Sequence, residues 1–228
     1  MEGAGKEHLP RRIAVSGAAL VLMAFAVVLA TRAVLGTSPM SSVPYVLSLV
    51  FPITLGTANA LFSALLIVLG VLIMGNLYRP IYLTQIATVA VFSVLCDVFA
   101  YLFGDFWIEG YVFQWLAVLA SCAVLAVGVS LLVAANLTMM PPEYLIMFIS
   151  FRTRMDFGKT KVFVDMAMVI AAAAISLAHF GAFVGVREGT VFTALALGTC
   201  MRYVSRWLEA VGFYAWIGRK GPSERRDG

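Results

Sequence analysis

Apolar runs of about 20 residues recur along the whole chain, and this feature constrains the fold more than any other. A helix of that length is long enough to cross the hydrocarbon core of a bilayer. Of the 228 residues, 62% are hydrophobic and only 12% are charged, whereas about a quarter of the residues in a soluble domain are charged. The sequence therefore predicts an all-α polytopic membrane protein surrounded by the lipid bilayer.

Six of these runs are predicted to be transmembrane helices, at residues 13–35, 56–76, 81–103, 112–137, 160–178 and 189–208. The chain then divides into five parts: an N-terminal tail (1–12), a first membrane repeat (13–104), an outer loop (105–111), a second membrane repeat (112–210) and a basic tail (211–228).

The distribution of basic residues predicts the orientation. With six spans and both termini cytoplasmic, only Arg32 and Arg187 of the sixteen Lys and Arg residues fall outside, and fourteen fall inside. The outer loop carries only acids, Asp105 and Glu109. Cytoplasmic loops of membrane proteins are enriched in Lys and Arg. This topology accounts for the net charge of +4 without nucleic-acid binding.

Two segments are interrupted by prolines at matching places. Residues 36–55 have no charge but contain three prolines, and residues 139–158 contain a double proline, a short amphipathic piece and a basic turn. Pro39 and Pro141 are 102 residues apart, as are Gly56 and Gly158. Broken segments at corresponding places in two halves are typical of the binding sites of transporters. We therefore expect two inverted three-helix repeats, each with a Pro-broken short segment.

The first broken segment has two interpretations. It either dips partway into the membrane, where irregular backbone must be covered by protein or line a wet cavity, or forms an ordinary interfacial loop. The double proline at 141–142 is expected to break an apolar helix.

Ionisable residues in or beside the later spans are the candidates for a site, because a charge inside a membrane usually faces a cavity or a partner. Asp97 has no basic neighbour within its helix, so it takes part either in function or in a buried structural hydrogen bond. Lys161 and Asp165 are four residues apart and can pair on one helix face. That pair either contacts a solute or is a simple ion pair at the cytoplasmic edge.

The motif GVREGT (185–190) contains three further candidates, Arg187, Glu188 and Thr190. Arg187 and Glu188 are adjacent and are expected to point apart. Backbone N–H groups at a helix start can hold an anionic group, and a well-capped outer turn is the rival interpretation. Glu143, just after the double proline, completes the set of substrate-binding or coupling candidates.

Enzyme, metal and cofactor functions have no support in the sequence. The two histidines lie in the tail and at a helix end, and none of the motifs HExxH, GxxxxGK(S/T), GxSxG or a paired-acid motif occurs. Cys96, Cys122 and Cys200 fall within apolar helices without CxxC spacing, which favours buried packing over metal binding.

Several motifs together resemble a known family. FGKTKVFVD (157–165), GVREGT (185–190) and MMPPEYL (139–145) are similar to sequences of the YczE/YitT-like group of bacterial integral membrane proteins, and LGTSP (35–39) and Asp97 match as well. That group usually has PGE where this chain has PPE at 141–143. The resemblance covers nearly the whole chain and implies a multi-pass protein of the bacterial cytoplasmic membrane with a presumed transport role.

The leading hypothesis is a membrane transporter that binds a small polar or anionic solute between the two broken segments; a homodimer is compatible with this prediction. Asp97, Asp165 and Glu188 are candidates for proton or cation coupling, and Lys161 and Arg187 for solute contact. The alternatives are a substrate-capture subunit of a multi-component importer and a non-transporting accessory membrane protein.

Overall fold

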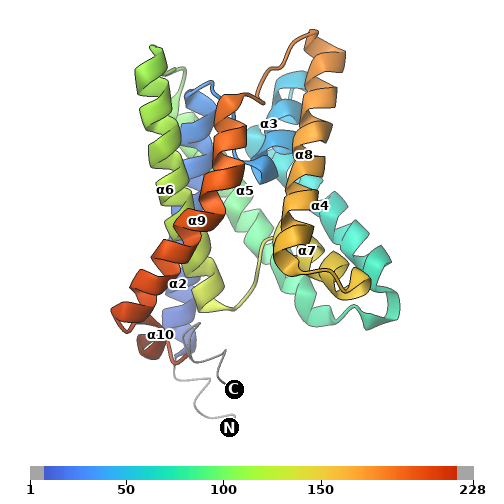
Figure 1. Cartoon of the computed structure of the whole chain (residues 1–228), viewed down its shortest axis with the longest axis vertical. Helices are drawn as coiled ribbons and strands as arrows, with labels where there is room; N and C mark the ends of the chain where they lie inside the picture. Colours follow the sequence, from blue (N-terminus) through green and yellow to red (C-terminus); the bar gives the residue numbers. More distant parts are fainter. Residues whose placement is uncertain (1–7, 220–228) are drawn as a thin grey trace.

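The computed structural model describes residues 8–219, and every regular element in that range is helical. The α-helices of this part are α2 (Leu9–Arg32), α3 (Pro39–Val50), α4 (Leu55–Met74), α5 (Thr84–Phe103), α6 (Tyr111–Ala135), α7 (Pro141–Thr153), α8 (Phe157–Phe180), α9 (Glu188–Ala210) and α10 (Phe213–Trp216). Two short 3-10 helices, η1 (Gly75–Leu77) and η2 (Pro80–Leu83), connect α4 to α5. The all-α prediction is confirmed for this part of the chain (Figure 1).

Five helices, α2, α4, α5, α6 and α8, are long and apolar enough to cross a membrane, so the chain is a multi-pass membrane protein. The sixth predicted span, residues 189–208, forms α9. This helix is long enough to cross a membrane but is not apolar enough. Arg202, Arg206 and Glu209 lie in its C-terminal half and lower its apolar character. The prediction of about six transmembrane helices is therefore confirmed for five.

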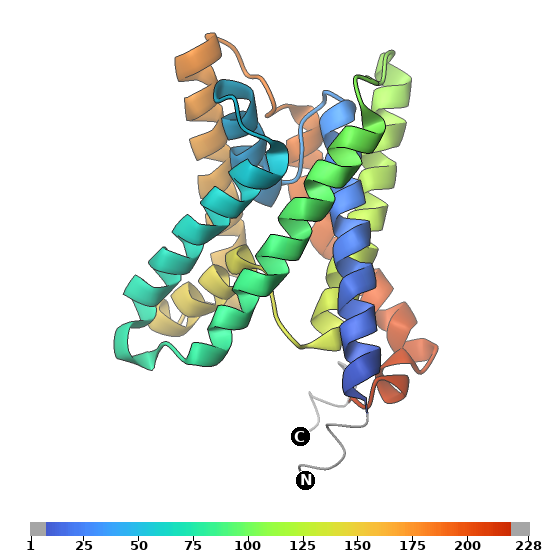
Figure 2. The same cartoon turned by 180° about the vertical axis from the view of Figure 1, so that it is seen from behind.

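The short helices α3 and α7 interrupt this series, and both begin inside the molecule. In Figures 1 and 2 the chain enters from the upper end before α3 and from the lower end before α7. Each helix then runs back toward the end from which the chain entered. Segments 36–55 and 139–158 thus both turn back partway along the molecule.

Proline positions explain where these two helices start. Pro39 and Pro141 occupy the beginning of α3 and α7, where the missing N–H removes no helical hydrogen bond. The preceding helix α6 already ends at Ala135, and the next residue, Asn136, adopts a left-handed conformation with φ of 46°. The double proline therefore starts α7 and does not break α6, which corrects the sequence prediction at this point.

The helices form two groups with separate hydrophobic cores. We call α2, α5, α6 and α9 the outer group and α3, α4, α7 and α8 the inner group, without reference to the sides of the membrane. In the outer group, α2 packs against α5 and α6, and α6 packs against α9. In the inner group, α3 and α7 each pack against α4 and α8. One core cluster contains residues of α2, α5, α6 and α9, and another contains residues of α3, α4, α7 and α8. The two groups are joined mainly by the α4–α5 contact and less extensively by α3–α9. Figure 1 shows the inner group on the right.

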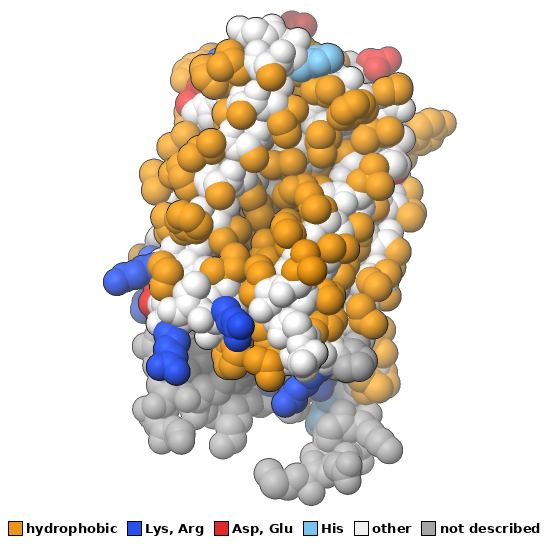
Figure 3. Space-filling model, turned by 90° about the vertical axis from the view of Figure 1, so that its right-hand side faces the viewer, with side chains coloured by type: hydrophobic (Ala, Val, Ile, Leu, Met, Phe, Trp, Pro, Cys, Tyr) orange, Lys and Arg blue, Asp and Glu red, His pale blue; other side chains and the backbone are white. Residues whose placement is uncertain are grey.

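The surface has an apolar belt and one basic end. Figure 3 shows hydrophobic side chains over most of one face, with Lys and Arg side chains gathered toward the lower end. Large hydrophobic side chains of α4, α5 and α8 are exposed, among them Leu72, Val94 and Phe163. Such a surface is expected where helices face lipid.

Candidate functional site

A cavity of about 410 Å³ lies between the two helix groups. Every α-helix from α2 to α9 contributes at least one lining residue. Its volume falls within the range of about 300–1,000 Å³ that is usual for small-molecule sites. The interior starts of α3 and α7 both line this cavity. Ser38 and Met40 lie there at the start of α3, and Met140 and Pro142 lie there at the start of α7. The two broken segments therefore meet at one site.

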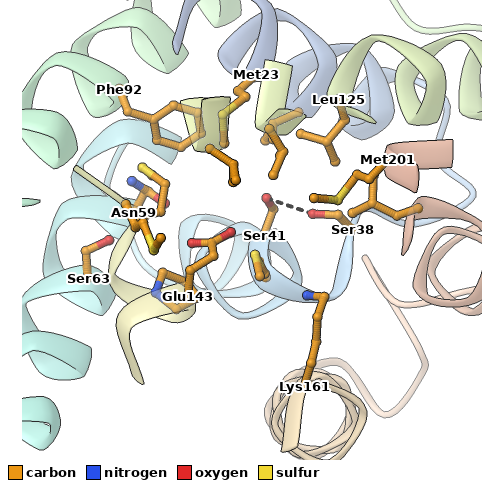
Figure 4. A pocket seen from close by; sticks show the side chains of 18 of the residues that line it. Met23, Ser38, Ser41, Asn59, Ser63, Phe92, Leu125, Glu143, Lys161 and Met201 are labelled. Atoms are coloured by element: carbon orange, nitrogen blue, oxygen red, sulfur yellow. Dashed lines mark hydrogen bonds between the residues drawn. The ribbon is translucent and has the colours of Figure 1, made fainter. Parts of the chain in front are cut away.

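The two groups supply different chemistry to the cavity. The outer group contributes only apolar side chains, namely Met23, Val27, Phe92, Leu125, Val129, Val133, Leu197 and Met201. All six polar lining residues come from the inner group or the residue just before it, namely Ser38, Ser41, Asn59, Ser63, Glu143 and Lys161. In Figure 4, Met23, Phe92, Leu125 and Met201 lie opposite Glu143 and Lys161. The cavity is thus amphiphilic. Its lining is more apolar than the binding of a small polar or anionic solute would require.

Glu143 is the carboxylate that faces this cavity. It occupies the third position of α7, directly after Pro141 and Pro142, and Figure 4 shows its carboxyl group pointing inward. The Oε2 atom is buried and has no hydrogen-bond partner among the described residues. Burial raises the pKa of the Glu143 carboxyl to about 7.

Lys161 faces the same cavity but already has a partner. Its Nζ lies 3.0 Å from Oδ2 of Asp165, one helical turn along α8, which confirms that the two side chains share a helix face. Asp165 is only 9% exposed, and its Oδ1 is buried without a hydrogen-bond partner in the described chain. The pair also borders a second cavity of about 350 Å³ between α3, α8 and α9. Lys161 lines both cavities.

Asp97 lies away from both cavities and caps a helix. Its Oδ1 accepts a hydrogen bond from the Gly56 N–H at 2.7 Å, and its Oδ2 accepts one from the Thr54 hydroxyl at 2.8 Å. Gly56 is in the first turn of α4, where backbone N–H groups have no partner within the helix. The side chain from α5 thus completes the start of α4, and this geometry favours the structural interpretation of Asp97.

We expect the Asp97→Ala variant to lose about 1–2 kcal/mol of unfolding free energy, because it leaves the part-buried Gly56 N–H without its acceptor. Asp97→Asn keeps one carbonyl oxygen and is expected to lose about half as much. Thermal unfolding of the purified protein in detergent would measure both. Equal losses for the two variants would contradict the capping role.

The GVREGT candidates lie at the start of α9, outside both cavities. Arg187 Nη2 approaches Glu188 Oε1 at 3.3 Å, and the two side chains are about 40% exposed. The prediction that they point apart is wrong, because the extended conformation of Arg187 just before the helix lets its long side chain turn back. The Gly189 N–H donates to the Leu35 carbonyl at 2.8 Å, and Thr190 is fully buried. The two family-like motifs LGTSP and GVREGT therefore pack on each other.

The structure brings two of the seven predicted site residues, Glu143 and Lys161, to the central cavity and places Asp165 beside them. It does not bring Asp97, Arg187, Glu188 or Thr190 there. Sequence reasoning missed the short polar residues of the cavity, Ser41, Asn59 and Ser63, and the six methionines that line it. The adjacent serines in PMSSVP were the one signal for this wall, because they lie in an otherwise apolar broken segment.

Comparison with models of protein families identifies a family for this chain. The sequence model of a family of unknown function (DUF6198) matches residues 10–206. No curated protein and no solved structure matches the chain. The match confirms that the chain resembles an uncharacterised family over most of its length, and it does not confirm the YczE/YitT-like name.

Proposed function

The chain belongs to DUF6198, a family of unknown function, and we propose from the geometry of its cavity that it is a membrane transporter for a small organic solute. The solute binds between the interior starts of α3 and α7. The observation that carries this proposal is the position of the cavity at the boundary between two helix groups with separate hydrophobic cores. A relative movement of the groups would change which side of the membrane the cavity faces.

The order of the helices supports an inverted repeat. In residues 9–103 a long helix of the outer group is followed by a short and a long helix of the inner group and then by another of the outer group. Residues 111–210 follow the same order. The short helices run toward opposite ends in Figures 1 and 2. We propose that the two halves have opposite orientations in the membrane, as in many secondary transporters.

The orientation proposed here places both termini, the turn near Arg79 and the α7–α8 turn on the cytoplasmic side of a bacterial membrane. The gathering of Lys and Arg at one end of the molecule in Figure 3 supports it. The acidic loop with Asp105 and Glu109 then faces outward.

Cysteine accessibility tests this proposal without knowledge of the solute. Cys96, Cys122 and Cys200 are replaced by alanine, and single cysteines are introduced at Ser41 or Met201 in the cavity. In oriented vesicles, a membrane-impermeant thiol reagent is expected to label the cavity cysteines from either side. Control cysteines at Arg154 and Asp105 are expected to react from the cytoplasmic and the outer side, respectively.

The outcomes separate the candidate functions. Labelling of the cavity cysteines from neither side would overturn the transporter proposal and favour an accessory membrane protein. Labelling from one side alone, under all conditions, would favour a substrate-capture subunit that depends on partner proteins. Reaction of the Arg154 control from the outside would reverse the proposed orientation.

A further inference from the structure

The apolar part of the cavity indicates the body of its occupant. Six of the eleven methionines of the chain line it, together with three phenylalanines, Phe62, Phe92 and Phe157. Thioether side chains adapt to irregular apolar shapes, and aromatic faces attract cations as well as apolar groups. An occupant that buries these surfaces must itself be largely apolar.

The charges at the cavity do not cancel. Lys161 is neutralised by Asp165 at 3.0 Å, whereas Glu143 has no cationic partner within ion-pair distance among the described residues and leaves a buried carboxylate oxygen without a hydrogen bond. The net charge of these three groups, when ionised, is −1. A buried carboxylate without a partner is costly, so the cavity as built favours a positive group.

The helix starts at the cavity are poor anion sites. Pro39 begins α3, and Pro141 and Pro142 begin α7, and proline has no N–H to donate. The Ser41 N–H already donates to the Ser38 carbonyl at 3.0 Å. The first residue of α7 with a backbone N–H is Glu143, which itself carries a carboxylate. An anionic solute would therefore find few donors here and one repelling charge.

We propose that the cavity binds a cationic amphiphile, a compact apolar or aromatic body with one protonated amine, and that Glu143 is its counter-ion. This inference rests on the proposed transport function and names its substrate class. The amine pairs with the Glu143 carboxylate beside the hydroxyls of Ser38 and Ser41. The apolar body packs against the wall formed by α2, α5, α6 and α9.

A proton and the amine compete for the same carboxylate. The charged groups that act on Glu143 are Lys161 and Asp165 of α8. Helix α4, which also packs against α7, carries no titratable residue. Tyr82 contacts α7 at Tyr144 and Phe148. Binding of the cation to a protonated site releases one proton. Transport of the cation in one direction is then coupled to proton movement in the other.

Three probes with the same phenyl ring and two-carbon spacing test the charge preference. They are 2-phenylethylamine (a cation), phenylalanine (a zwitterion) and 3-phenylpropionate (an anion). Binding to the full-length protein in detergent is measured by thermal shift and titration calorimetry. We expect only 2-phenylethylamine to stabilise the protein, with an affinity that rises about tenfold between pH 6 and pH 8 as the pKa near 7 is crossed. The amine itself stays protonated over this range.

Variants identify the group responsible. Glu143→Gln is expected to weaken 2-phenylethylamine binding at least tenfold and to abolish its pH dependence. Glu143→Asp, which keeps the charge, is expected to retain the pH dependence. Asp105→Asn, in the exposed outer loop, is the matched control and is expected to bind as the wild type does. Size-exclusion chromatography establishes that each variant remains folded.

Any of three results would overturn this inference. The first is preferential binding of 3-phenylpropionate or phenylalanine with loss of binding in Lys161→Met. The second is absence of 2-phenylethylamine binding at pH 8, and the third is equal binding by wild type and Glu143→Gln. None of these results changes the cysteine accessibility from the two membrane sides, so failure of the substrate class is distinguishable from failure of the transport function.

Discussion

Gly56→Ala is expected to disrupt the joint between α4 and α5 and to lower the free energy of unfolding by about 3 kcal/mol, at the upper end of the usual cost of overpacking. A Cβ at this position would overlap the Ser93 carbonyl oxygen and would lie 2.6 Å from the Cγ and Oδ2 atoms of Asp97. Backbone cannot move aside as a flexible side chain can. The substitution would also push Asp97 out of its cap on the start of α4.

Gly198→Ala is the matched control, because a Cβ added to this helical glycine meets nothing within 4 Å among the described residues apart from its chain neighbours and the nearby backbone of its own helix. Alanine there is expected to leave stability unchanged or to raise it by up to about 1 kcal/mol through helix propensity. Thermal unfolding of the two purified variants in detergent gives the comparison. A Gly56→Ala protein that unfolds at the wild-type midpoint would show that α4 and α5 do not approach as closely as described.

Lys161→Met is the second substitution with a large expected effect, because it removes the partner of a nearly buried carboxylate. Breaking a buried ion pair costs about 3–5 kcal/mol. The Lys161 side chain is 25% exposed, so we expect a smaller loss of about 2 kcal/mol after allowing for solvent screening. The double variant Lys161→Met/Asp165→Asn is expected to recover most of that loss, since neither member of the pair is then left as a charge without its partner.

The exposed pair of Arg187 and Glu188 is the control for this double-mutant cycle. Both side chains are about 40% exposed, and surface pairs contribute about 0–1 kcal/mol. Removal of either partner there is expected to change the unfolding midpoint little. Additive losses in the Lys161 and Asp165 variants would mean that the two side chains do not interact.

The membrane helices could be predicted because their signal is local. Runs of apolar residues locate α2, α4, α5, α6 and α8 to within a few residues of their ends. Prolines locate the starts of α3 and α7, since proline is favoured at the first turn of a helix. The sixth span is the exception. Helix α9 is apolar over much of its first half but carries Arg202 and Arg206 in its second half, which lowers its apolar character as a whole.

The site could be predicted only in part, because a charge in a membrane segment does not reveal which neighbour it meets. Glu143 and Lys161 do face the cavity, but Asp97 is used to cap α4, a role set by how α4 and α5 pack. Ser41 belongs to the adjacent serines that are the one signal for this wall, whereas Asn59 carries no charge and gives no signal above the background of a polar residue in a helix. Their position on one wall follows from tertiary packing alone.

The chain passes between the two helix groups four times, at residues 33–38, 75–83, 136–140 and 181–187. Each passage contains at least one residue with a left-handed backbone, among them Gly36, Gly75, Asn136 and Gly181. The shortest passage has five residues, and a fully extended chain of that length reaches about 17 Å. If the two groups move as proposed, these linkers limit the movement: one group could tilt or slide past the other by part of that distance, but not by the roughly 30 Å thickness of the hydrocarbon core.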